Sequence, residues 1–187
     1  DRSTGVALLD ERSVLAVGVH GDEAASQPQH SGRTAWLHLV DRQVGLVRQR
    51  GRVRSVAELT RLRLASRPAS AGVREYLDGA LRKAGLDPAR LHQRALLLPS
   101  HRDVVCAVAR GEADVGLASS AWAAQLGLSF TPLLEEPYGL LIRATDLGRP
   151  EVIRLCETAQ TKEYRRALAA IAGYEARHAG LLRFQAA

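Results

Sequence analysis

Three short turns in the sequence combine small residues, a hydroxyl group and the expected start of a helix. A helix begins with backbone N–H groups that lack an intrahelical partner, and its peptide dipoles place about half a positive charge there. Serine or threonine adds a hydroxyl donor, so several such turns at one place would bind an oxyanion or a carboxylate. The turns are Ala69-Ser70-Ala71-Gly72, Pro99-Ser100-His101 and Ala118-Ser119-Ser120, with Ser3-Thr4-Gly5 as a fourth candidate.

Each of these features also has a purely structural explanation. Ser100 and Ser119 stand where helix N-caps are expected, and capping is a common task of serine at such positions. Gly72 would equally serve close packing of a helix. Arg67 and Arg74 bracket the first turn. Either arginine would clamp a carboxylate or phosphate through two hydrogen bonds, or be solvated at the surface.

Residues for metal binding or catalysis are not evident in the sequence. The histidines lack a metal-binding spacing such as HExxH, and no G-x-S-x-G motif marks a nucleophile. Cys106 and Cys156 form no CxxC pair, which favours a reducing compartment. Glu135 and Glu136 follow an expected strand, where they suit either a ligand contact or a solvated strand end, the more common case. Tyr138 suits either a core edge or a ligand contact. We therefore expect no catalytic residue, no metal and no cofactor.

The composition narrows down the class of protein. The 187 residues, 46% of them apolar, suffice for one domain or two small lobes. The 26 Lys and Arg against 20 Asp and Glu give a net charge of +6, which favours acidic partners. The densest basic run, residues 48–54, lacks aromatic residues and suggests a solvated loop rather than a nucleic-acid contact. Neither a membrane span nor a signal peptide is visible, and the lack of any Met suggests a fragment or a processed product.

The elements that must position these turns alternate between strands and helices. A capping box predicts a short helix at 55–59, and the segments 35–40 and 44–49 are either strands or one bent connection. Strands separated by helices predict an α/β fold with a largely parallel sheet, with ligands at the carboxyl ends of strands. Strands are expected at 14–19, 62–65, 96–98, 113–118, 129–134 and 138–142, and helices at 4–11, 73–84, 100–110, 119–126, 151–159 and 162–172.

The order of the motifs resembles a known family. The chain is similar to the periplasmic-binding-protein-like domain of the type II, molybdate- and tungstate-binding class, in the form that bacterial one-component regulators carry behind a helix-turn-helix. The motifs are collinear over nearly the whole chain. The segments that carry the resemblance are Ser3-Thr-Gly5, Val17-Gly-Val-His20, Gln43-Val-Gly-Leu-Val47, residues 66–74, Ser100-His-Arg-Asp-Val-Val105, Gly111-Glu-Ala-Asp-Val-Gly-Leu117, Glu136-Pro-Tyr138 and Gly173-Tyr-Glu175.

The resemblance implies two α/β lobes with mostly parallel sheets and crossing hinge strands, lobe I comprising 1–47 and 138–187 and lobe II 48–137. It implies a ligand held between the lobes by Ser3, Thr4, His20, Arg67, Ser70, Gly72, Arg74, Ser100, His101, Ser119 and Tyr138. Two departures from the family loop matter. The Asn and Gln of the family's N-R-Q become Ser66 and Pro68, while Arg67 is retained. Where the family loop has G-S-G-T-R, this chain has Ser70-Ala71-Gly72-Val73-Arg74, so two hydroxyl groups are replaced by methyl groups. A ligand with an apolar part near Ala71 and Val73 fits this change, and so does loss of binding.

These features support a cytoplasmic ligand-sensing domain that is not an enzyme. It would bind a small anion or anionic metabolite and regulate transcription through an attached DNA-binding domain that is absent from this chain. DNA would be a partner only through that domain, a membrane would not be a partner, and a homodimer is an expected assembly. The alternative is the solute-binding component of an ABC transporter for a molybdate-like anion. An enzyme lacks support from any catalytic pair, and direct nucleic-acid binding rests on charge alone.

Overall fold

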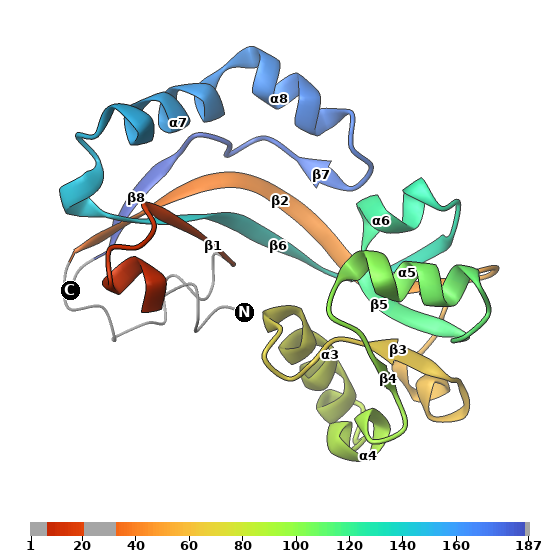
Figure 1. Cartoon of the computed structure of the whole chain (residues 1–187). Helices are drawn as coiled ribbons and strands as arrows, with labels where there is room; N and C mark the ends of the chain where they lie inside the picture. Colours follow the sequence, from red (N-terminus) through yellow and green to blue (C-terminus); the bar gives the residue numbers. More distant parts are fainter. Residues whose placement is uncertain (1–6, 21–32, 186–187) are drawn as a thin grey trace. The chain divides into compact units, whose positions relative to one another are not determined.

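The chain forms two compact units joined by two long strands. The computed structural model describes residues 7–20 and 33–185 (Figure 1). Unit 1 comprises Asp1–Arg42 and Glu136–Ala187, and unit 2 comprises Gln43–Glu135. Strands β2 (Thr34–Arg48) and β6 (Ser129–Arg143) each have 15 residues and contribute to both units. The crossing strands of a two-lobed α/β fold are therefore present.

Unit 1 is a small antiparallel sheet with helices. Strand β1 (Ala16–His20) pairs with β6, and β7 (Tyr174–Glu175) and β8 (Leu182–Gln185) both pair with β2, all antiparallel. Residues 7–10 are helical, and the 3-10 turn η2 (Ala144–Asp146) precedes α7 (Pro150–Gln160) and α8 (Lys162–Ala169). Pro150 opens α7, where its missing N–H costs nothing, and the Thr161 hydroxyl caps α8.

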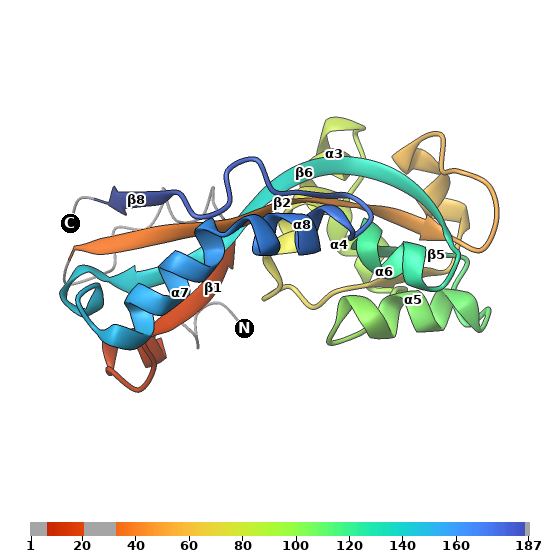
Figure 2. The same cartoon turned by 90° about the horizontal axis from the view of Figure 1, so that it is seen from above.

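The core of unit 1 follows from the alternation of side chains along its strands. Trp36 and Leu141 pack on one face of the sheet, against Leu9. Their neighbours Leu37 and Ile142 pack on the other face, in a cluster with α7. Figures 1 and 2 show α7 and α8 over the strands of this unit. Both faces are covered, so β2 is buried almost without interruption.

Unit 2 has a sheet between two layers of helices. Strand β5 (Val115–Ser119) pairs antiparallel with β2, and β3 (Leu64–Ser66) pairs parallel with both β5 and β4 (Leu96–Leu97). Its helices are η1 (Val56–Arg61), α3 (Gly72–Lys83), α4 (Pro88–His92), α5 (His101–Ala109) and α6 (Ser120–Gln125). Leu46 and Leu117 share a cluster with Leu77 of α3, whereas Val47 packs with Val105 of α5. Helices α3 and α5 accordingly lie on opposite faces of this sheet (Figure 1).

Gly45 has a packing reason to be glycine. A Cβ atom at this position would lie 2.1 Å from the carbonyl oxygen of Thr131 and 2.9 Å from the Phe130 ring. Strands β2 and β6 therefore approach closely inside unit 2. The Gln43-Val-Gly-Leu-Val47 motif places its only residue without a side chain at this contact.

Most of the expected elements are confirmed, with three corrections. The expectation of mostly parallel sheets is wrong: only the β3 pairs are parallel among the pairs of the described residues. Helical crossovers impose parallel pairing only on the strands they connect, and β1, β7 and β8 are not connected to their partners in this way. Segments 129–134 and 138–142 form a single strand through Pro137, and 35–40 with 44–49 form the continuous β2. Helix α4 was not predicted.

The basic run 48–54 begins at the end of β2 and continues as a turn that is exposed at residues 49–52, with Gly51 in the left-handed region at φ 73°, whereas Val53 is buried. The two cysteines are free thiols. Within the part of the chain that the structure describes, no helix combines the length and the apolar character that a membrane span requires.

Candidate functional site

A fully buried carboxylate, Glu136, is the centre of a polar cluster in unit 1. Its Oε1 accepts a hydrogen bond from Nε of Arg42 at 2.6 Å, and its Oε2 lies 2.8 Å from Nδ1 of His20. The Glu136 side chain is 0% exposed, whereas those of Arg42 and His20 are 14% and 16% exposed. The carboxylate is therefore inside the protein, and the two nitrogen-bearing groups reach the surface.

Strand register brings this cluster together. His20 of β1 stands directly opposite Tyr138 of β6, with their rings 5.7 Å apart in an edge-to-face contact. Glu136 lies two residues before Tyr138 and so on the same face of β6. The Arg42 guanidinium, from β2, stacks over the Tyr138 ring at 4.6 Å. Three strands thus supply one group of four side chains.

The electrostatics of the cluster favour an ionised Glu136. Burial alone would raise the pKa of this carboxyl group, because charge is costly away from water. The contact with Nδ1 of His20 and the positive charge of Arg42 outweigh burial, so the pKa of Glu136 lies below its ordinary value. A carboxylate that stays charged at neutral pH holds Arg42 in a fixed orientation.

Arg42 retains hydrogen-bonding capacity beyond this ion pair. Glu136 occupies only the Nε donor of the guanidinium. Among the described residues, no other hydrogen bond involves the two terminal nitrogens of Arg42. Those nitrogens carry four N–H groups in the planar fork that matches carboxylate and phosphate oxygens. The cluster therefore presents donors suited to an anion.

The predicted loop at residues 66–74 lies in unit 2, between β3 and α3. Ser70 is exposed, and Ala71 is the N-cap of α3 but makes no side-chain hydrogen bond there. Val73 is 3% exposed and packs in the core of the unit, so it does not offer an apolar contact to a ligand. Of the two methyl-bearing replacements, only Ala71 stands near the surface.

Arg74 serves a structural contact in this loop. It donates from Nη1 to the carbonyl oxygen of Arg67 at 3.0 Å, and its Nε lies 3.4 Å from Asp78. Asp78 in turn contacts Nε2 of the buried His92 at 2.7 Å. Burial lowers the pKa of His92, and the charge of Arg74 adds to this effect, while Asp78 opposes it. Arg74 thus joins the loop to α3 and, through Asp78, to α4.

The remaining predicted site residues are distributed over unit 2 and the start of the chain. The hydroxyl of Ser100 accepts from the Asp103 backbone N–H at 3.0 Å and contacts the Asp103 carboxylate at 2.6 Å, so it caps α5. His101 begins α5, and Ser119 is the buried N-cap of α6 without a side-chain cap bond. Ser3 and Thr4 lie outside the described residues. The structure unites His20 with Tyr138 in one unit, and Arg67 with Ser70, Gly72 and Arg74 in the other.

Two functional candidates were missed by sequence reasoning. The first is Arg42, which received no role at all; of the two interpretations that the sequence left open for Glu136, the solvated strand end is wrong, because this residue is buried within β6. The second is a group of two histidines and one aspartate in unit 1, His38, Asp41 and His178, whose ligand atoms all lie within 4.8 Å of one another. No short sequence spacing could have revealed it, because His178 is 137 residues from Asp41.

Residues 4–160 match the PBP superfamily domain. The chain belongs to this superfamily of periplasmic-binding-protein-like domains. Its relatives include an uncharacterised Clostridium pasteurianum protein from the 5′ region of a 2Fe-2S ferredoxin gene, 30% identical over 105 residues, or 56% of this chain and 93% of that protein. Another is the uncharacterised protein YvgK of Bacillus subtilis strain 168, 25% identical over 77% of this chain. The chain spans 48% of YvgK.

Solved structures share the fold. A candidate phosphate ABC transporter substrate-binding protein from Clostridium perfringens, with bound phosphate, matches 89% of this chain and 81% of its own length, with a TM-score of 0.68 and 11% identity. A C206 mutant of Corynebacterium glutamicum OxyR matches 82% of this chain and 49% of its own length, with a TM-score of 0.57 and 15% identity. At these identities the likeness shows the fold alone.

Proposed function

We propose that this protein is a cytoplasmic ligand-sensing domain that binds a small anion or anionic metabolite. The observation that carries the proposal is the Arg42 guanidinium, fixed by the buried Glu136 while its terminal N–H groups are left available among the described residues. The superfamily supplies ligand-binding domains, and one similar structure contains phosphate. We infer that His20 and Tyr138 flank the ligand in unit 1.

Unit 2, taken by itself, carries a second set of candidate anion donors. The turn before α3 offers the exposed Ser70 and the backbone N–H groups at Gly72, where the helix dipole favours negative charge. Arg67 precedes this turn. We propose these groups as anion contacts, and we assign Arg74 and Ser100 to structural roles because their polar atoms already serve the loop and the α5 cap.

Titration calorimetry with the whole chain tests anion binding. Phosphate, sulfate, molybdate and a set of small carboxylates serve as probes. The Arg42→Lys variant keeps the positive charge but loses the fork of donors, so affinity for the best probe should fall at least about tenfold. Arg63→Lys is the matched control, because Arg63 belongs to an exposed pair with Asp114 in unit 2. Absence of binding by every probe, or equal binding by Arg42→Lys, would contradict the proposal.

We further propose that ligand binding regulates transcription through an attached DNA-binding domain. The support is the collinear series of motifs shared with one-component regulators. The alternative is a solute-binding component of an anion transporter, which the similarity to the Clostridium perfringens structure favours. Sequencing of the coding region upstream of residue 1 separates the two: a helix-turn-helix supports the regulator, and a signal peptide supports the transporter component.

A further inference from the structure

A second polar cluster in unit 1, separate from the Glu136 cluster, has the composition of a metal site. Nε2 of His38 lies 3.2 Å from Oδ1 of Asp41, and Nδ1 of His178 lies 3.0 Å from Oδ2 of the same carboxylate. The rings of the two histidines are 5.5 Å apart. Two imidazole nitrogens thus face the two oxygens of one carboxylate, and the ligand atoms of the three residues all lie within 4.8 Å of one another.

Backbone hydrogen bonds fix the geometry of the cluster. His38 and Asp41 belong to β2, and His178 lies in the connection between β7 and β8, both of which pair with β2. The N–H of His38 donates to Leu181, and its carbonyl oxygen accepts from Gly180. Side chains of Gln160 and Arg165 also donate to the connection, at the carbonyl oxygens of Gly180 and Ala179. The site is therefore held in place before any ligand binds.

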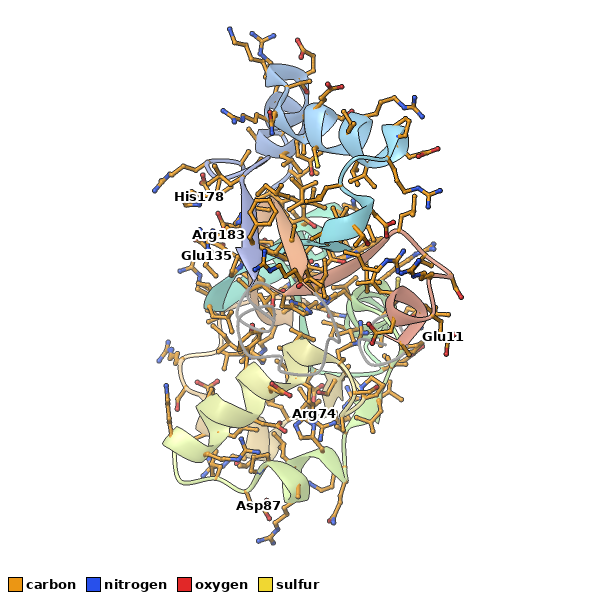
Figure 3. The ribbon with its side chains drawn as sticks, turned by 90° about the vertical axis from the view of Figure 1, so that its left-hand side faces the viewer. Glu11, Arg74, Asp87, Glu135, His178 and Arg183 are labelled. Atoms are coloured by element: carbon orange, nitrogen blue, oxygen red, sulfur yellow. The ribbon has the colours of Figure 1, made fainter. Side chains whose placement is uncertain are left out.

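His38 has an unsatisfied nitrogen that points into the cluster. Its side chain is 2% exposed, and within residues 7–20 and 33–185 neither ring nitrogen has a hydrogen-bond partner of acceptable geometry. A buried polar group without a partner is costly, and bound ions are a common remedy. His178, by contrast, is 44% exposed, so solvent reaches the cluster from that side (Figure 3).

We propose that His38, Asp41 and His178 bind a divalent transition-metal ion of the zinc type. Zinc–ligand bonds of about 2.0 to 2.2 Å place tetrahedral ligand atoms about 3.3 to 3.6 Å apart, and the three ligand atoms of this group all lie within 4.8 Å of one another, so small side-chain rotations bring them to that spacing. Two imidazoles and one carboxylate suit zinc and its first-row neighbours rather than calcium or magnesium. Three protein ligands leave a coordination position for water on the exposed side. The bound ion would link the β7–β8 connection to β2.

One neighbouring charge opposes the site. Arg183 lies close enough to act on the charge of His38, and its guanidinium stacks over Trp36 at 5.7 Å. The Asp41 carboxylate, which contacts both histidines, offsets this charge. Binding of the ion therefore depends on Asp41 as well as on the imidazoles. Adventitious binding by a single exposed histidine would not depend on Asp41.

Zinc titration of the whole chain, first treated with a chelator, tests the proposal. Calorimetry should give one Zn²⁺ per chain, and Co²⁺ in the same site should show visible ligand-field bands. His178→Ala should weaken binding at least about tenfold while leaving the fold intact, because this side chain is largely exposed. Asp41→Asn should have the same effect, and Arg177→Ala on the same connection should bind as the parent does. No stoichiometric binding, or binding unchanged by His178→Ala, would overturn the proposal.

Discussion

The hydroxyl of Tyr138 lies directly over the α-carbon of Gly18, so close that a Cβ atom there would stand 2.1 Å from it. Gly18 is opposite Leu140 in the β1–β6 register, and Tyr138, two residues before Leu140, is its diagonal neighbour on the same face. Glycine at this position therefore allows Tyr138 to lie flat along β1, beneath Arg42 and beside His20. The orientation of the proposed ligand contact depends on a residue that itself has no side chain.

Gly18→Ala should displace the Tyr138 ring and weaken anion binding without unfolding the protein. The atom that must move is the far end of a partly buried side chain, so we expect a loss of about 1 kcal/mol or less in the free energy of unfolding. Urea unfolding and calorimetry with the best anionic probe measure the two effects. Gly79→Ala is the control: Gly79 is inside α3 with open space around it, so this variant should gain about 0.5 to 1 kcal/mol and bind normally.

Glu136→Gln should destabilise the protein by about 2 kcal/mol, because it leaves Arg42 without its buried counter-ion. Glu135→Gln is the adjacent control. Glu135 is exposed, so its substitution should change the free energy of unfolding by about 0.5 kcal/mol or less. Urea unfolding at pH 7 measures both variants. Equal stability of the two would mean that the buried pair contributes nothing measurable.

The same variant should alter the response to acid. The pKa of Glu136 is lowered in the folded state. The contribution of this carboxylate to the free energy of unfolding is therefore complete above its ordinary pKa of 4.5, and it is lost as the pH falls through the lower pKa of the folded protein. The difference in stability between the parent and Glu136→Gln should therefore shrink as the pH decreases below 4.5. A constant difference from pH 7 to pH 3 would contradict this assignment of charge.

Local signals in the sequence predicted local structure well. The Ser55 and Glu58 capping box predicted the start of η1, and the structure shows both of its hydrogen bonds. Ser100 caps α5 through Asp103, three residues away. Short continuous apolar runs predicted the buried strands, because a strand that is covered on both faces carries apolar residues at successive positions. Such signals involve residues of one turn or one strand, which are close in the sequence and therefore also close in space.

The polar clusters could not be predicted in this way. Glu136 stands between Glu135 and Pro137, a pattern typical of a strand end, and only its pairing with Arg42, 94 residues away, makes it a buried charge. Antiparallel register between β1 and β6 is likewise set by long-range pairing. Val73 was misinterpreted for a related reason: its position beside Gly72 suggested the ligand, but helical geometry turns it into the core.

Ala71→Ser should stabilise the protein by about 1 kcal/mol, because a serine N-cap accepts a hydrogen bond from the first turn of α3 that alanine leaves unmade. Ala80→Ser, in the middle of the same helix, is the control and should cost about 0.5 kcal/mol. Thermal and urea unfolding measure both. Ala71→Ser also restores one hydroxyl of the loop found in the similar family, so calorimetry should show tighter oxyanion binding if this turn contacts the ligand.

The last prediction concerns His92, which is buried at 5% exposure with its Nε2 2.7 Å from Asp78. Burial and the charge of Arg74 lower its pKa below the ordinary 6.5, although Asp78 acts in the opposite direction. The unfolded chain therefore binds more protons than the folded one just below pH 6.5. The contribution of the neutral imidazole to the free energy of unfolding is complete above pH 6.5. It is lost as the pH falls through the pKa that His92 has in the folded protein.

His92→Gln removes this titration while keeping a donor for Asp78. Urea unfolding between pH 8 and pH 5 should show a smaller decrease in stability for His92→Gln than for the parent, and one proton limits the difference in slope to about 1.4 kcal/mol per pH unit. The imidazole resonances of the parent provide a direct check, because His92 should titrate below pH 6.5 in the folded protein. A His92 titration above 6.5 would show that the contact with Asp78 outweighs burial, and the parent would then gain stability, relative to the variant, as the pH falls.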